Sequence, residues 1–267
     1  MADVSDVESA LVTAAAAALY PEGASRPSAV NMDVKIFRGW PVADALDRDM
    51  AAGRACVSVF PVPGASRDTT RFADAWEDVT PSVCPVRVTT AGGVATFSGL
   101  PDPSVLCGAR AHGIAYARRC VAEDTPETVA AALAALVPGA VAVGATLRVP
   151  GAPDFDARAD HDRIAEREAR RQTQDFTVTC WCPTPDSRDR IAAVVDGHFA
   201  LHDWLTLADG TECRLTYGGS TTRDEPGKAA VWRRDLRYRV EYATVERVVV
   251  PPVLFVVGTT GGCNILA

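Results

Sequence analysis

The chain lacks the sequence patterns that accompany several common enzyme chemistries. It contains no G-x-S-x-G elbow, no P-loop and no dinucleotide-binding fingerprint. The glycine-rich stretch 258–262 has no helix pattern after it, so it does not resemble a phosphate-binding loop. A catalytic triad assembled from distant residues would have to draw on four histidines: His112, His161, His198 and His202. The usual nucleophile and phosphate chemistries therefore have no support in the sequence.

Long hydrophobic runs and an excess of positive charge are also missing. The apolar stretch 14–20 is too short to span a bilayer, and it follows Asp3, Asp6 and Glu8 instead of the basic segment of a secretory signal. We therefore expect a protein that is cytoplasmic at synthesis and makes no membrane contact. The net charge of −7 argues against a generally nucleic-acid-binding surface.

The composition is that of a folded protein. Of 267 residues, 48% are hydrophobic and 23% are charged, which suits one large or two small domains. The 8 cysteines are scattered through a chain much longer than a disulfide-stapled miniprotein. We expect most of them to be small buried apolar residues.

Hydrophobic periodicity predicts one core that is interrupted in sequence. Residues 4–62 read as helix, strand, helix, strand, and residues 174–248 read as strand, helix, strand, long strand. The expected fold class is α+β, with helices packed on a mostly antiparallel sheet and an inserted β-rich subdomain carrying one helix. The expected core comprises residues 1–78 and 172–250.

The remaining segments have their own patterns. Residues 79–153 contain hairpin patterns and one amphipathic helix, which predicts the inserted subdomain. Residues 154–171 predict a charged connection that is helical over 160–170. The prolines and glycine of 61–64 predict the end of a strand, and the polar stretch 218–228 predicts a loop. Residues 251–267 predict a C-terminal arm that docks on its own core or on a neighbouring subunit.

Residues 231–245 predict a long strand with one packed and one charged face. The apolar positions are Trp232, Leu236, Tyr238, Val240 and Tyr242. The charged positions, which we expect at an interface with a neighbour or at a channel, are Arg233, Asp235, Arg237, Arg239 and Glu241. A merely solvated face is the alternative. The arm supplies a second expected interface: Val253, Leu254, Phe255, Val256 and Val257.

Three groups of residues suggest metal ligands but fit no established pattern. His198 and His202 are four apart on a predicted helix, with Asp203 beside them, yet no glutamate follows His198 as a metalloprotease requires. Cys180 and Cys182 lack the spacing and the second pair of a zinc knuckle, and Cys213 alone does not supply that pair. The acidic run has no calcium-loop glycine or terminal glutamate; its members are Asp154, Asp156, Asp160, His161 and Asp162. We therefore predict no catalytic residue, cofactor or metal.

Several short stretches have a recognisable sequence. Residues 34–41 read VKIFRGWP, and residues 57–61 read VSVFP. Residues 170–178 read RRQTQDFTV, and PTP follows at 183–185. Residues 233–236 and 240–244 read RRDL and VEYAT. These stretches resemble proteins encoded in the tail-gene clusters of tailed bacteriophages and prophages. The block at 116–136 is similar to small hairpin-plus-helix modules of tail and baseplate proteins.

Within that group, the split core resembles the tail terminator family. The resemblance implies a homohexameric ring that caps the tail tube at its head-proximal end. It also implies contacts with the tail tube protein and a head-completion or neck protein, a channel through which DNA passes, and a location in the virion. The inserted block and the arm depart from smaller members, so a baseplate or other neck component is an alternative. A metal-dependent hydrolase using His198 and His202, or a monomeric small-molecule-binding protein, are alternatives of other classes.

Overall fold

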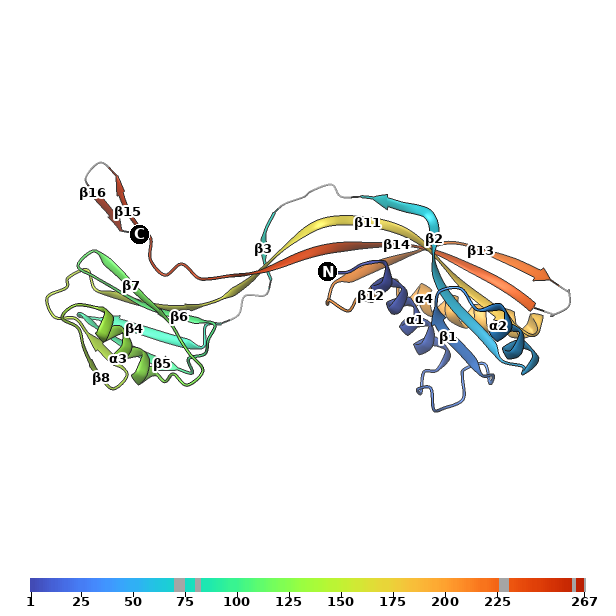
Figure 1. Ribbon diagram of the computed structural model, residues 1–267, viewed down its shortest axis with the longest axis horizontal. Helices are drawn as coiled ribbons and strands as arrows, with labels where there is room; N and C mark the ends of the chain where they lie inside the picture. The colour runs from blue at the N-terminus through green and yellow to red at the C-terminus, as the bar shows by residue number, and fades with distance from the viewer. Residues whose placement is uncertain (70–74, 80–82, 226–230, 261–262, 267) are drawn as a thin grey trace. The chain divides into compact units, whose positions relative to one another are not determined.

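The structure divides the chain into two compact units. A computed structural model describes residues 1–69, 75–79, 83–225, 231–260 and 263–266 (Figure 1). Unit 1 comprises Met1–Ala75 and Arg167–Glu246, and unit 2 comprises Trp76–Glu166 and Arg247–Ala267. Most of the expected connection 154–171 and the whole expected arm 251–267 thus belong to unit 2 instead of forming separate pieces.

The chain is mixed α+β, strands predominate, and most of the strand pairs are antiparallel. The helices are α1 (Val4–Leu19), α2 (Ala43–Ala51), α3 (Pro126–Leu136) and α4 (Pro185–Leu201). Thr125 and Thr184 cap α3 and α4, and in both helices proline occupies the first turn, where its missing N–H costs no hydrogen bond. No helix in the described part of the chain is long and apolar enough to span a bilayer.

The largest sheet lies mainly in unit 1. Its strands, in spatial order, are β1 (Val34–Arg38), β2 (Ala55–Asp68), β11 (Arg163–Cys182), β14 (Val231–Val250), β13 (Glu212–Glu225) and β12 (Trp204–Thr206). β1 and β2 are parallel, whereas β2 with β11 and β13 with β14 are antiparallel. β11 begins in unit 2 and ends in unit 1, and β14 runs the opposite way.

One face of this sheet carries the core of unit 1. Val7 and Leu11 of α1 and Ile191 of α4 are fully buried together with strand residues. The strand contribution comes from alternate positions: Val57, Val59, Phe176, Val178, Cys180, Leu236, Tyr238, Val240 and Tyr242. We call the opposite face, which bears Ser58, Thr179, Trp181 and Arg233, the outer face.

The expected helix at 160–170 is wrong, because this segment is strand. Residues 156–161 form β10, and Arg163 begins β11. Charges spaced for helical ion pairs instead meet partners on the neighbouring strand: Arg167 with Glu246 at 2.7 Å, and Arg247 with Glu166 at 2.6 Å. Cross-strand pairs of opposite charge stabilise a sheet as i,i+4 pairs stabilise a helix.

Two expected breaks in strands are also wrong. β2 continues through 61–64. β1 ends opposite Val59, so the prolines at 61 and 63 lie beyond the end of β1. Their missing N–H groups therefore interrupt no hydrogen bond between β1 and β2. The expected loop 218–228 is strand as far as Glu225, paired with β14, and 226–228 lie outside the described residues. A bulge at Tyr217 and Gly219 absorbs the irregularity, and Gly219 has a φ of 132°, which favours glycine.

Unit 2 contains small antiparallel sheets and α3. One sheet has the order β4 (Val86–Ala91), β5 (Val94–Gly99), β9 (Thr146–Arg148) and β8 (Val141–Val143). Another has the order β10 (Asp156–His161), β6 (Val105–Ala111) and β7 (Ile114–Arg119). β3 (Glu77–Asp78) pairs with β11, and β15 (Val257–Thr260) pairs with β16 (Cys263–Leu266). Phe97, Leu133 and Leu147 are buried in a core separate from that of unit 1.

The segment after β14 docks on unit 2. Leu254 is buried, and the space beside Gly108 of β6 is filled by the side chains of Leu254 and Phe255. Arg158 Nη1 donates a hydrogen bond to the carbonyl of Leu254 at 3.3 Å, and its guanidinium lies 5.5 Å from the centre of the Phe255 ring. The arm therefore covers part of its own chain.

Candidate functional site

The expected alternation along β14 is confirmed by the pattern of burial. Leu236, Tyr238, Val240 and Tyr242 are buried in the core of unit 1. Trp232 is half-buried, while Arg237 and Arg239 are exposed on the outer face. The charged positions of β14 therefore do not share one environment.

Arg233 belongs to a group of aromatic side chains on the outer face. Its guanidinium lies 4.6 Å from the centre of the Trp181 ring and 5.1 Å from that of Trp40. Trp40 also packs edge-on against Trp181 and Phe60, with centroids 5.3 and 5.0 Å away. We call Trp40, Phe60, Trp181 and Arg233 the aromatic–arginine cluster. A guanidinium over an indole face is the favourable cation–π arrangement.

Polar contacts fix the orientation of this cluster. Trp181 Nε1 donates a hydrogen bond to Ser58 Oγ at 2.9 Å. Arg233 Nε donates to Asp235 at 2.8 Å, and Thr179 Oγ1 donates to the same carboxylate oxygen at 2.7 Å. Trp40 nevertheless remains 57% exposed. The cluster is thus a rigid surface group with a large uncovered aromatic side chain.

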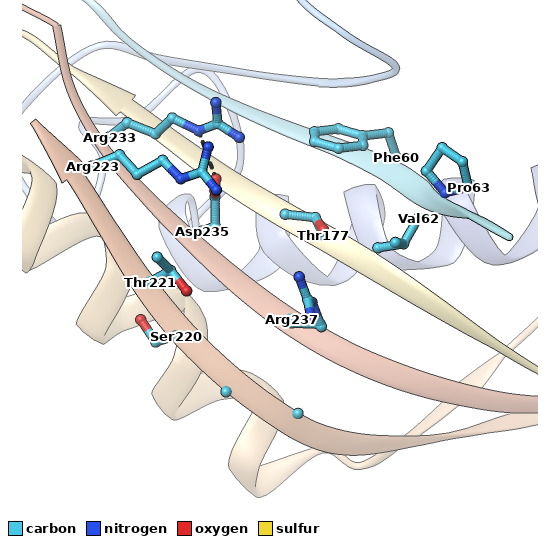
Figure 2. Close-up of a pocket in the computed structure, with 12 residues that line it drawn as sticks. Phe60, Val62, Pro63, Thr177, Ser220, Thr221, Arg223, Arg233, Asp235 and Arg237 are labelled. Atoms are coloured by element: carbon cyan, nitrogen blue, oxygen red, sulfur yellow. Dashed lines mark hydrogen bonds and ion pairs between the residues drawn. The ribbon is translucent and has the colours of Figure 1, made fainter. Parts of the chain in front are cut away.

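An open cavity of about 410 Å³ adjoins the cluster on the outer face (Figure 2). Arg223, Arg233 and Arg237 line it, with Asp235 as the one acidic residue among the lining side chains. The rest of the lining is Phe60, Val62, Pro63, Thr177, Gly218, Gly219, Ser220 and Thr221. A cavity lined by three arginines, one aspartate and Phe60 suits a carboxylate ligand.

The other charged positions of β14 have partners within unit 1. Arg239 Nε donates to Asp175 at 3.0 Å, and Arg171 Nη1 donates to Glu241 at 3.4 Å. Arg171 also pairs with Glu168 at 2.6 Å. Of the five positions, the structure thus brings Arg233, Asp235 and Arg237 together at the cavity and places Arg239 and Glu241 in other ion pairs.

The expected interface residues of the arm divide into two groups. Leu254 and Phe255 face unit 2, whereas Val253 and Val256 are 73% and 59% exposed. The side chain of Val257 lies outside the described part of the structure.

The expected histidine pair is close together, but its contacts are local. The His198 and His202 rings stack with centroids 4.3 Å apart, and His202 Nδ1 lies 3.0 Å from the carbonyl oxygen of His198. Burial and the neighbouring His202 lower the pKa of His198. Asp203 lies 4.0 Å from Arg214. Among the described residues, a different group brings three metal-ligating side chains within 4.8 Å of one another: Cys84, Asp160 and His161.

The described cysteines are mostly buried, as expected. Cys84 is half-buried, whereas Cys56, Cys107, Cys120, Cys180, Cys182 and Cys213 are buried, and all seven are free. Burial raises the pKa of Cys56 and of Cys213 to about 11. These two residues therefore remain thiols near neutral pH, which makes them poor nucleophiles.

The aromatic members of the cluster were not predicted as site residues. The sequence does offer one sign of such a cluster: Trp181 follows Thr177 and Thr179 on the polar side of an alternating strand, where a large aromatic residue is unexpected. Trp40 comes from the segment after β1, and only the strand order brings it beside Trp181. No family model matches the chain, and no curated protein matches it.

Proposed function

We propose that this protein is a structural subunit of a bacteriophage tail, a tail terminator that forms a ring at the head-proximal end of the tail tube and joins the tail to the head. In this proposal, unit 1 is the terminator-like core, in which helices pack on a mostly antiparallel sheet. Unit 2 is the inserted β-rich subdomain with its one helix. The assignment to the tail rests on the resemblance of residues 34–41, 57–61, 170–178, 183–185, 233–236 and 240–244.

The observation that carries the structural role is the aromatic–arginine cluster, whose exposed member is Trp40, beside an arginine-lined cavity. Tryptophan and arginine are enriched among the residues that dominate binding at protein interfaces. Here Trp40 is exposed although Trp181, Phe60 and Arg233 hold it in place. An ordered, uncovered aromatic group of this kind favours contact with another protein surface over a solvated face.

The charge of the chain supports a second copy as that partner. Acidic residues outnumber basic ones, 34 to 27, so the surface of each copy is rich in carboxylates. A ring requires two different surfaces on each subunit, and an arginine-lined cavity on one copy complements carboxylates on the next. The overall net charge of −7 also suits a channel through which DNA passes without being held.

Localisation in assembled particles tests the proposal. Gold-labelled antibody against this chain should bind at the junction between head and tail. A particle lineage from which the gene is deleted should yield separate heads and tails, and supplying the wild-type chain should restore joining. Label at the distal end would favour the baseplate alternative, and joined particles without the chain would contradict any joining role.

A further inference from the structure

We propose that unit 2 contains a zinc site whose protein ligands are the Cys84 thiolate, the Asp160 carboxylate and the His161 imidazole. This site is independent of the tail assignment and of the His198–His202 pair, which belongs to unit 1.

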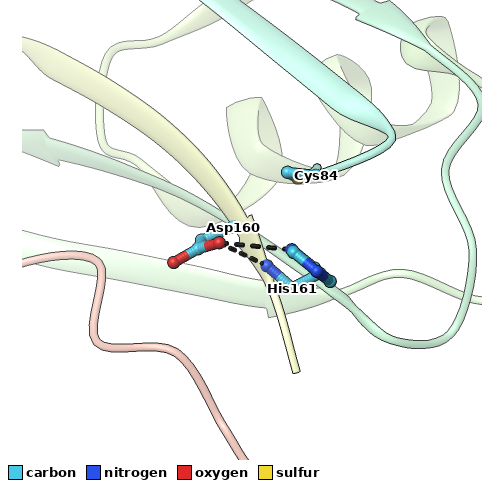
Figure 3. Close-up of side chains that lie close together, drawn as sticks. All are labelled: Cys84, Asp160 and His161. Atoms are coloured by element: carbon cyan, nitrogen blue, oxygen red, sulfur yellow. Dashed lines mark hydrogen bonds and ion pairs between the residues drawn. The ribbon is translucent and has the colours of Figure 1, made fainter. Parts of the chain in front are cut away.

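The three ligands come from two distant segments of unit 2. Cys84 precedes β4, whereas Asp160 and His161 end β10 (Figure 3). Their donor atoms all lie within 4.8 Å of one another. His161 is 8% exposed, and Cys84 and Asp160 are half-buried, so the group is partly accessible to solvent.

The separation of Asp160 and His161 fits shared coordination. Asp160 Oδ1 lies 3.3 Å from His161 Nδ1. Tetrahedral zinc with bonds of about 2.0–2.1 Å to oxygen and nitrogen places two such ligands about 3.3 Å apart. With a zinc–sulfur bond of about 2.3 Å, the thiolate would lie about 3.6 Å from the nitrogen. The donor atoms lie within 4.8 Å of one another, so the Cys84 sulfur and the His161 nitrogen need to approach by at most about 1.2 Å.

The acidic run around this group leaves Asp160 in a different position from its neighbours. Asp156 pairs with Arg158 at 2.8 Å, and Asp162 pairs with Arg119 at 2.8 Å. Asp154 instead accepts backbone N–H groups of His112 and Gly113. Among the described ion pairs, Asp160 is joined to His161 and to no arginine or lysine. Its carboxylate is therefore the acid of this run that is placed for a metal cation.

The donor set selects the metal. Thiolate and imidazole ligands favour zinc, whereas magnesium and calcium require sets of oxygen ligands. The Asp102 carboxylate instead accepts hydrogen bonds from the hydroxyl and the backbone N–H of Ser104. A water molecule would complete four ligands. The bound ion would cross-link the segment before β4 to the end of β10 and so stabilise unit 2.

Metal binding to the full chain tests the site. After chelator treatment, the protein is dialysed against micromolar zinc, and bound metal is measured by mass spectrometry. We expect about one zinc ion per chain for wild type, and a loss of affinity greater than tenfold in Cys84→Ser and in His161→Asn. The matched control is His112→Asn, because His112 is exposed in the same unit and its φ of 53° suits asparagine. A second control, His198→Asn, should bind as wild type does.

Alkylation of the wild-type protein provides a readout that does not depend on whether the variants fold. Zinc should slow the labelling of Cys84 by iodoacetamide at least about tenfold, because a coordinated thiolate is blocked. Wild-type protein that retains no zinc would overturn the proposal. So would unchanged labelling of Cys84, or zinc that is lost from His198→Asn while Cys84→Ser retains it.

Discussion

Arg233 packs over Trp181 on the outer face of unit 1: the Arg233 guanidinium lies 4.6 Å from the centre of the Trp181 ring, and Arg233 Nε donates to Asp235 at 2.8 Å. A salt bridge and a cation–π contact thus hold the same side chain. The side chains of Arg233 and Asp235 are 18% and 15% exposed, so solvent screens this pair less than an ordinary surface pair. The arrangement makes the cluster rigid before any partner binds.

Replacing Asp235 tests this rigidity. Asp235→Asn removes the charge that Arg233 and Thr179 contact, and we expect it to lower the free energy of unfolding by about 1–3 kcal/mol. The matched control is Arg239→Gln, whose pair with Asp175 involves a side chain that is 64% exposed, and which should change stability by less than about 1 kcal/mol. Urea unfolding of the two variants measures both effects, and equal losses would contradict the account.

Two glycine substitutions test the docking of the arm. A Cβ at Gly108 would lie 2.8 Å from Leu254 Cδ1 and 2.9 Å from the Tyr116 carbonyl oxygen, so Gly108→Ala should displace the arm and destabilise unit 2 by about 1–3 kcal/mol. Gly197 lies within α4 with open space around it, and Gly197→Ala should stabilise the protein by up to about 1 kcal/mol.

Limited proteolysis distinguishes these two variants. Cleavage between residues 251 and 256 should accelerate in Gly108→Ala and remain at the wild-type rate in Gly197→Ala. If the arm resists cleavage in both variants, the docking of Leu254 does not depend on the space beside Gly108.

Asp49 predicts a specific acid dependence of stability. Lys35 donates to its carboxylate at 2.7 Å, and this hydrogen bond is the main cause that lowers the pKa of Asp49 below its ordinary value. A carboxyl with a depressed folded pKa stabilises the protein above the unfolded value of about 3.9, and this contribution is lost as the pH falls through the folded pKa. Wild-type stability should therefore decline below about pH 4.

The variant Asp49→Asn lacks that contribution, so its difference from wild type should be largest near neutral pH and shrink as the pH falls. Urea midpoints at a series of acidic pH values measure this convergence. Asp47→Asn, at an exposed position of the same helix, is the control and should follow the wild-type curve. If the stabilities of wild type and Asp49→Asn fall in parallel as the pH is lowered, Asp49 does not cause the acid dependence.

Unit 1 should fold without unit 2. In the described part of the chain, its buried core draws only on residues between Ala2 and Val59 and between Phe176 and Tyr242. A chain in which a Gly/Ser linker replaces residues 77–166 and which stops after Glu246 should therefore unfold cooperatively. Loss of any cooperative transition would instead indicate that the two units depend on each other for folding.

The sequence predicts best the features that depend on local periodicity. The alternation of Leu236, Tyr238 and Val240 with charged neighbours identifies β14 because burial on one face requires a period of two. The charged residues of 160–170 wrongly predict a helix, because residues of opposite charge can form ion pairs along a helix or between neighbouring strands. Only the neighbouring strand, through Glu246 and Arg247, decides between the two arrangements.

Sites assembled from distant segments could not be predicted in this way. Trp40, Trp181 and Arg233 come from three parts of the chain, and the order of β2, β11 and β14 brings them together. Cys84 and His161 likewise meet through the packing of unit 2, and no spacing in the sequence connects them. The acidic run in the sequence contains Asp160 and His161, but no pattern connects this run with Cys84.

The mass of the protein in solution, measured by sedimentation for wild type and for Arg237→Glu, tests whether the chain forms a ring through its arginine-lined cavity. Arg237 lines the cavity with an exposed side chain, so reversing its charge should repel the carboxylates of a neighbouring copy without unfolding the subunit. The account predicts a closed ring of six chains for wild type and free, folded subunits for Arg237→Glu, with a weaker effect for Arg239→Glu. A wild-type monomer at every concentration, or an Arg237→Glu ring of unchanged mass, would contradict it.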